Sequence, residues 1–195
     1  MTELSTHATL LARLTKDGDP HAWRDFASRY ADLIRGFARR QGVQPADCDD
    51  VLQDVLLALT KAMPGFEYDP ARGKFRSYLK TVTIRAVFRK SCQNSGAAQL
   101  GSLDEQVSSA SQDGRVEELW EAEWRQYHLR QAMRTVETEF NRKDLDAFQA
   151  YVAQGREARQ VADDLGMTVD QVYQAKSRIL RRLEQLIEGQ VRDEG

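Results

Sequence analysis

Long apolar runs are absent from this chain of 195 residues. No segment approaches the roughly 18 consecutive apolar residues that a membrane-spanning helix needs. The start of the chain, Met1–Leu14, also lacks the apolar core and the cleavage pattern of a signal peptide. We therefore expect a cytoplasmic protein without membrane insertion.

Cysteine and histidine are also scarce. Cys48 and Cys92 have no paired ligand spacing, and the three histidines are scattered along the chain. We therefore expect no metal site, and two cysteines that are reduced and partly buried. Because no nucleophile–base pair, phosphate-binding loop or pair of catalytic carboxylates is evident, the sequence predicts neither an enzyme nor a cofactor.

Acidic residues are missing from one long segment, 70–103. The net charge of −2 on its own argues against a nucleic-acid-binding protein, but the charges are unevenly distributed. The acid-free segment contains Arg72, Lys74, Arg76, Lys80, Arg85, Arg89 and Lys90. Just before it stand Asp47, Asp49, Asp50, Asp54, Glu67 and Asp69, opposed only by Lys61. The pattern predicts an anionic surface followed by a cationic one.

Apolar residues recur at helical spacing in the first half of the chain. Asp19-Pro20 opens the first predicted helix, because proline is well tolerated in the first helical turn. A second helix is predicted from Asp47 and a third over 75–90. The residues predicted to face inward are, in chain order, Trp23, Phe26, Tyr30, Leu33 and Phe37; Val51, Val55, Leu59 and Met63; Phe75, Leu79, Val82 and Ala86.

Residues 93–114 change in character. Serine, glycine, glutamine and alanine dominate, apolar residues are sparse and no periodicity holds, which is typical of a flexible linker. We therefore predict an all-α fold of two small helical domains, at 1–92 and 119–195, joined by a linker at 93–118.

The second half is helical as well. Trp120, Trp124, Leu129, Met133, Val136 and Phe140 form an apolar stripe, and Leu145, Phe148 and Val152 suggest a shorter helix. A further helix with Val161, Ala162 and Leu165 ends at Gly166, and Thr168 can cap the next one, whose inner face carries Val172, Ile179, Leu183 and Leu186.

This last pair of helices has the pattern of a helix-turn-helix. The second helix would project Asp170, Gln171, Gln174, Ser177 and Arg178 outward. Glutamine and arginine can contact base edges in the major groove, whereas Lys176, Arg181 and Arg182 suit phosphates. The alternative is an ordinary helical hairpin with a solvated basic face.

Aromatic residues accompany the cationic segment. Phe66, Tyr68, Tyr78 and Phe88 lie within or beside it, and single-stranded DNA binding needs both cations and rings. We predict that Tyr78 and the basic residues contact DNA and that Phe75 belongs to the core. The alternative is that the basic residues merely solubilise the helix.

Asp50, Gln53 and Asp54 share one face of the second helix, since they are three and four positions apart. Taken alone, this face is the ordinary polar surface of an amphipathic helix.

Three motifs together resemble sigma factors of the extracytoplasmic-function group of the sigma-70 family. The segment DDVLQDVLLAL at 49–59 resembles the part that grips the clamp helices of RNA polymerase, FRSYLKTV at 75–82 the start of the promoter-melting helix, and VADDLGMTVDQVYQAKSRILRRL at 161–183 the minus-thirty-five helix-turn-helix. The resemblance covers about 19–187 apart from the linker.

The resemblance implies a bacterial protein that binds core RNA polymerase through Asp50, Gln53 and Asp54. It implies minus-ten DNA contacts at Lys74, Arg76, Tyr78, Lys80, Arg85 and Arg89. The minus-thirty-five contacts would be Thr168, Asp170, Gln171, Gln174, Lys176, Ser177, Arg178, Arg181 and Arg182. Promoter DNA would be bound both as duplex and as melted strand, and an anti-sigma factor is a further partner that the resemblance leaves open.

Two pairs of residues depart from many relatives of that group. Ile84-Arg85 stands where they carry Arg-Asn, and Tyr173-Gln174 where they carry Lys-Ser, so their promoter preferences do not transfer. Two other classes of protein stay open: a helix-turn-helix regulator that acts without polymerase, and a purely structural helical interaction protein.

Overall fold

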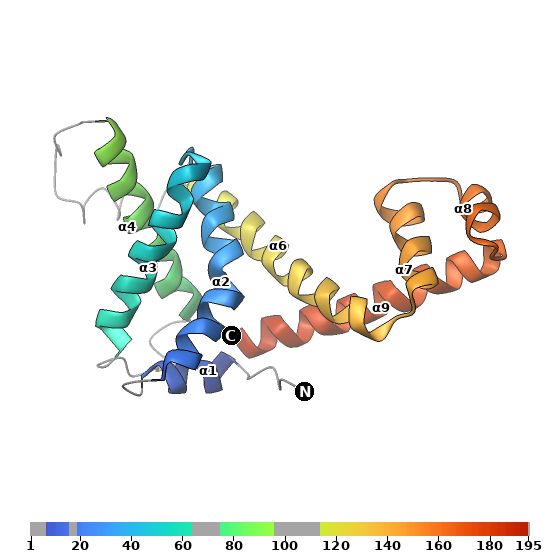
Figure 1. The fold of residues 1–195 in the computed structure, drawn as a ribbon, viewed down its shortest axis with the longest axis horizontal. Helices are drawn as coiled ribbons and strands as arrows, with labels where there is room; N and C mark the ends of the chain where they lie inside the picture. Colours follow the sequence, from blue (N-terminus) through green and yellow to red (C-terminus); the bar gives the residue numbers. More distant parts are fainter. Residues whose placement is uncertain (1–6, 16–18, 64–74, 96–113, 195) are drawn as a thin grey trace. The chain divides into compact units, whose positions relative to one another are not determined.

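The computed structural model describes residues 7–15, 19–63, 75–95 and 114–194 (Figure 1). Within these ranges the chain is helical and contains no strand, which confirms the all-α prediction. Most of the expected linker, 96–113, lies outside the described residues, as do Lys74, Phe66 and Tyr68.

The chain divides into two compact units. Met1–Tyr127 and the last three residues, from Asp193, make up the first, and His128–Arg192 the second. The division falls inside one helix, α6 (Gly114–Glu139).

The first unit contains α1 (His7–Leu14), α2 (Pro20–Arg40), the short 3-10 turn η1 (Pro45–Asp47), α3 (Cys48–Ala62), α4 (Phe75–Ser95) and the first half of α6. Helices α2, α3 and α4 lie side by side (Figure 1). The predicted inner faces are confirmed: Phe26, Tyr30, Leu33 and Phe37 are fully buried and Trp23 is partly buried against the same core. The inward residues of α3 and α4 are buried too, including Phe75 at 1% exposure.

The first helix, α1, was not predicted from the sequence. Leu10, Leu11 and Leu14 bury one side of this eight-residue helix in the core of the first unit. Their spacing of one and four positions is helical, but so short a helix depends on tertiary packing rather than on propensity.

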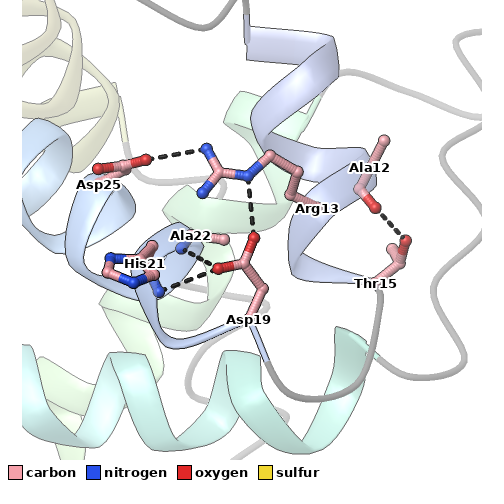
Figure 2. A network of polar contacts seen from close by, with 7 residues as sticks. All are labelled: Ala12, Arg13, Thr15, Asp19, His21, Ala22 and Asp25. Carbon is pink, nitrogen blue, oxygen red and sulfur yellow. Dashed lines mark hydrogen bonds and ion pairs between the residues drawn. The ribbon is translucent and has the colours of Figure 1, made fainter. Parts of the chain in front are cut away.

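A polar network joins α1 to the start of α2 (Figure 2). Asp19 caps α2, because its carboxylate accepts hydrogen bonds from the backbone N–H groups of His21 and Ala22. Arg13 donates to the same carboxylate at 3.0 Å and to Asp25 at 2.9 Å. The Arg13 hydrogen bond, followed by that of the Ala22 amide, lowers the pKa of Asp19. The cap therefore remains charged from neutral pH down to below the usual aspartate range, and is lost as pH falls through that lowered pKa.

The first half of α6 packs into the first unit, although the sequence analysis assigned residues from 119 onward to the second domain. Val116, Trp120, Trp124 and Tyr127 are buried in the same core as α2. The Trp120 ring meets Phe37 edge-on at 5.2 Å, and Tyr127 stacks on Tyr30 at 5.4 Å. Burial of these large rings against α2 is strongly favourable, because each aromatic side chain removes a large apolar surface from water. The first half of α6 therefore belongs to the first unit.

The second unit contains the rest of α6, α7 (Arg142–Phe148), the π-helical segment η3 (Gln149–Ala153), α8 (Ala158–Leu165) and most of α9 (Val169–Glu194). Asn141 caps α7 by accepting a hydrogen bond from the Asp144 amide. Leu145, Phe148 and Val152 were predicted to share a short helix, and 41% of Val152 is exposed. The π-helical turn at 149–153 has more residues per turn than an α-helix and rotates Val152 off the apolar face.

Gly36 provides a test of how the first half of α6 is seated. A Cβ atom at this position of α2 would collide with the carboxylate of Glu123, which is 4% exposed and paired with Arg40 at 2.5 Å. We expect Gly36→Ala to lower the stability of the first unit by about 1 kcal/mol, since overpacking of about 1–3 kcal/mol exceeds the helical gain of about 1 kcal/mol.

The matched control is Gly189→Ala in α9, where a Cβ would meet nothing within 4 Å. It should raise stability by about 0.5–1 kcal/mol. Urea unfolding followed by tryptophan fluorescence reports the first unit, because Trp23, Trp120 and Trp124 all lie in it, while circular dichroism reports both units. An unchanged midpoint for Gly36→Ala would show that Glu123 moves aside freely and that α6 is loosely packed against α2 at this point.

Candidate functional site

The predicted polymerase-binding residues lie on one side of α3. Gln53 is exposed, and Asp50 and Asp54 have carboxylates that reach toward α4. Asp50 pairs with Lys90 at 2.6 Å, and Asp54 with Arg89 at 3.5 Å. Their side chains keep 60% and 40% exposure, so both carboxylates remain accessible to a partner.

The anionic and cationic surfaces that the sequence predicted therefore meet at this point. Lys90 also pairs with Asp47 at 3.1 Å, and Asn94 donates a hydrogen bond to that carboxylate. The hydrogen bond from Asn94, and then that from Lys90, lowers the pKa of Asp47, and hydrogen bonding to Asp50 raises the pKa of Lys90. The C-terminal part of α4 is thus partly neutralised by α3.

The first turns of α4 face a different set of acids. Arg76 pairs with Glu121, and Lys80 with Glu117 at 2.5 Å, both from the first half of α6. The Arg76 guanidinium also lies over the Trp124 ring, 4.7 Å from its centroid. The hydrogen bond from Arg76 lowers the pKa of Glu121, so this carboxylate is ionised at neutral pH. Lys74, the first predicted DNA contact in this region, lies outside the described residues.

Tyr78 and Arg85 complete the predicted strand-binding set. Arg85 is exposed, and Tyr78 is partly buried with its ring 6.4 Å from that of Phe75. Burial raises the pKa of the Tyr78 hydroxyl, while the nearby charge of Arg85 acts in the opposite direction. An arginine beside a half-buried ring combines the cationic and stacking groups that bind unpaired nucleotides.

Helices α8 and α9 form the predicted helix-turn-helix. Gly166 ends α8 in the left-handed conformation, at φ 57°, which other residues adopt only at a cost. Thr168 caps α9 as predicted: its hydroxyl accepts from the Gln171 amide, and the Gln171 side-chain oxygen accepts from the Thr168 amide at 2.8 Å. This reciprocal pair is a capping box. Val161 and Val172 are fully buried between the helices.

The outer surface of α9 carries a shallow hollow. Asp170, Gln174, Ser177 and Arg178, four of the five residues predicted to face outward, line it together with Tyr173. Tyr173 was not among the predicted contact residues, although it is 45% exposed and its ring packs edge-on against Tyr151 at 5.6 Å. Gln171, the fifth residue, has its carbonyl oxygen engaged in the cap.

The four basic residues of α9 that were predicted to contact bases or phosphates differ in their surroundings. Arg178 donates to Asp144 at 2.9 Å, and Arg182 donates twice to Glu139, each time at 2.7 Å. Lys176 lies over the Tyr151 ring, with 5.4 Å between the ammonium and the centroid. Arg181 is exposed. Among these four described cations, Arg181 is therefore the one that the rest of the fold uses least.

Metal ligands do not gather at any of these positions. In the part of the chain that the structure describes, no group of three or more His, Cys, Asp or Glu side chains could hold a metal ion. None of the described helices is long and apolar enough to cross a membrane.

A known protein family matches the three helices that carry the acidic and basic surfaces. Residues 26–91, which extend from α2 through α3 and most of α4, match the family described as sigma-70 region 2. This match likens the chain to the sigma-70 family over 66 of its 195 residues. All the residues predicted to bind polymerase, and all those predicted for minus-ten DNA, fall inside the matched range.

Two other comparisons add little to this assignment. No curated protein matches the sequence. Among solved structures, the one described as the structure of CnrH in complex with the cytosolic domain of CnrY is 18% identical, with a TM-score of 0.37, over 92% of this chain and 96% of that chain. That score is too low to support an argument about fold or partners.

Arg178 gives the sharpest test of this surface, because its partner Asp144 has a side chain only 9% exposed. We expect Arg178→Ala to lower the stability of the second unit by about 1–2 kcal/mol, since it removes a hydrogen bond from a buried carboxylate. The control Arg181→Ala, which removes the same charge from an exposed position, should leave stability unchanged. Circular dichroism during urea unfolding measures both. Equal stability of the two variants would show that the Arg178–Asp144 pair does not stabilise the second unit, which would leave DNA contact as the proposed role of Arg178.

Proposed function

We propose that this protein is a sigma factor of the extracytoplasmic-function group, which binds core RNA polymerase and directs it to promoters. The observation that carries the proposal is the sigma-70 region 2 match over 26–91, which contains both the acidic face of α3 and the acid-free helix α4. The capped helix-turn-helix of the second unit supports it from an independent part of the chain.

The proposed division of labour follows the charges. The carboxylates of Asp50 and Asp54 on α3 would dock on polymerase, and the cations and the partly buried Tyr78 ring of α4 would hold the unpaired strand. In the second unit, α9 would enter the major groove of the upstream element, with Gln174 toward base edges and Arg181 toward phosphates. Promoter opening would be driven by tighter binding of the melted strand than of the duplex. The polymerase would carry out the chemistry.

Core binding can be tested on α3 without reversing any charge. Asp50→Asn with Asp54→Asn should weaken binding to core polymerase about tenfold, or about 1.4 kcal/mol. The control is Asp25→Asn with Asp32→Asn on α2, which makes the same charge change and also breaks the ion pair of Asp25 with Arg13. Fluorescence titration of labelled protein with core enzyme compares the two. Equal weakening by both variants would assign the effect to net charge and remove α3 from the proposed interface.

Strand capture can be tested at Arg85, which is exposed on α4. Arg85→Ala should lower open-complex formation on a duplex promoter about fivefold, or about 1 kcal/mol for one charge-assisted contact. The loss should be smaller on a template with a pre-melted bubble, and upstream protection should persist. Arg24→Ala, an exposed cation of α2, is the control.

Permanganate footprinting of unpaired thymines, alongside protection of the upstream element, measures both steps on both templates. Loss of upstream protection with normal melting of the bound complexes would contradict this allocation of roles. Normal DNA binding by the isolated chain, with no stimulation of core polymerase, would instead favour a regulator that acts without polymerase.

A further inference from the structure

Two of the cations expected to hold the DNA strand are paired with carboxylates of α6 within the first unit. Arg76 and Lys80 lie one turn apart on α4, and Glu121 and Glu117 lie one turn apart on α6. The pairs run in opposite senses, 76 with 121 and 80 with 117, so the two helical segments are antiparallel where they meet. A row of carboxylates therefore follows the row of cations.

The same stretch of α6 supplies an aromatic face. The Trp124 ring lies under the Arg76 guanidinium at 4.7 Å, and Trp124 is itself only 5% exposed. A single strand of nucleic acid binds a cationic surface through a row of phosphates and through flat bases that stack on arginine or aromatic side chains. Here the carboxylates correspond to the phosphates and the Trp124 ring to a base. The first half of α6 thus makes the same kinds of contact with α4 that a single DNA strand is expected to make.

The contact is held by burial as well as by charge. Lys80 and Arg76 side chains retain 18% and 26% exposure, less than the 47% of Arg89, which pairs with α3. Trp120 and Tyr127, both 1% exposed, anchor the segment on α2. Ion pairs at this exposure each contribute little, so a strand offering several phosphates can compete for the two cations.

We propose that the first half of α6, 114–127, is an internal competitor for single-stranded DNA, which covers part of the strand-binding surface of α4 until a strand displaces its carboxylates. This inference rests on the proposed function for the location of the strand. It implies that the free protein binds unpaired DNA more weakly than the cations of α4 would allow. Contact with a non-promoter strand would be suppressed until other contacts bring the strand to α4.

The test removes the two competing charges in the full chain. Glu117→Gln with Glu121→Gln should raise the affinity of the free protein for a labelled mixed-sequence DNA oligonucleotide about tenfold. The plot of log affinity against log salt should steepen by about 1.4, which is about 0.7 for each of two added phosphate contacts. The control, Glu118→Gln with Glu137→Gln, makes the same charge change on exposed positions of α6 and should show neither effect beyond that of net charge.

A further variant guards against indirect effects. Adding Arg76→Ala and Lys80→Ala to the double glutamine chain should abolish its gain in affinity, and circular dichroism should report the same helix content throughout. Affinity and salt dependence equal to the control pair would overturn the inference, as would a gain that survives the two alanine substitutions. If the gain appears but no variant stimulates core polymerase, the covered surface stands and the sigma-factor proposal falls.

Discussion

The burial of Trp120 against α2 is the constraint on which the charged surface of the first unit depends. Its indole is 1% exposed and meets Phe37 edge-on, with Trp124 and Tyr127 following at helical spacing in the same core. Once this stripe is fixed, the 3.6-residue period determines which neighbours face α4 and which face α2. Glu117 and Glu121 then reach the cations of α4, while Glu123 reaches Arg40.

The electrostatics of α4 follow from this arrangement. Helix α4 carries five cations and no acid in a chain with a net charge of −2, and the fold pairs four of them with two neighbours. Arg89 and Lys90 meet the carboxylates of α3, and Arg76 and Lys80 meet those of α6. An anionic ligand that binds these four cations therefore has to exchange with internal carboxylates, whereas Arg85 on the same helix is exposed.

Local patterns were enough to predict the main helices, because a helix with one buried face has apolar residues at every third or fourth position. The inner faces of α2, α3 and α4 were predicted residue by residue, and the turn between α8 and α9 followed from Gly166 and Thr168. Those residues act through their own backbone conformation and nearest neighbours, which a sequence displays directly.

Tertiary partners were not predictable in the same way. The apolar stripe of α6 is continuous across two units, so periodicity alone could not show that Trp120 and Trp124 pack on α2. Arg178 and Gln171 were predicted to contact DNA, and their partners within the fold, Asp144 and the cap of α9, are identified only by the structure. Helix α1 was missed because three leucines in eight residues carry too little signal.

Hydrogen exchange, measured residue by residue on the full chain, tests most directly whether the first half of α6 covers α4 and yields to a strand. In the free protein, amides over 117–127 should be protected to a degree similar to those of α4. Saturation with a single-stranded oligonucleotide should lower protection over 117–127 while protection of α4 is kept or increased. Unchanged protection over 117–127 in the saturated complex would contradict the account, because the strand would then bind without releasing the carboxylates of α6 from α4.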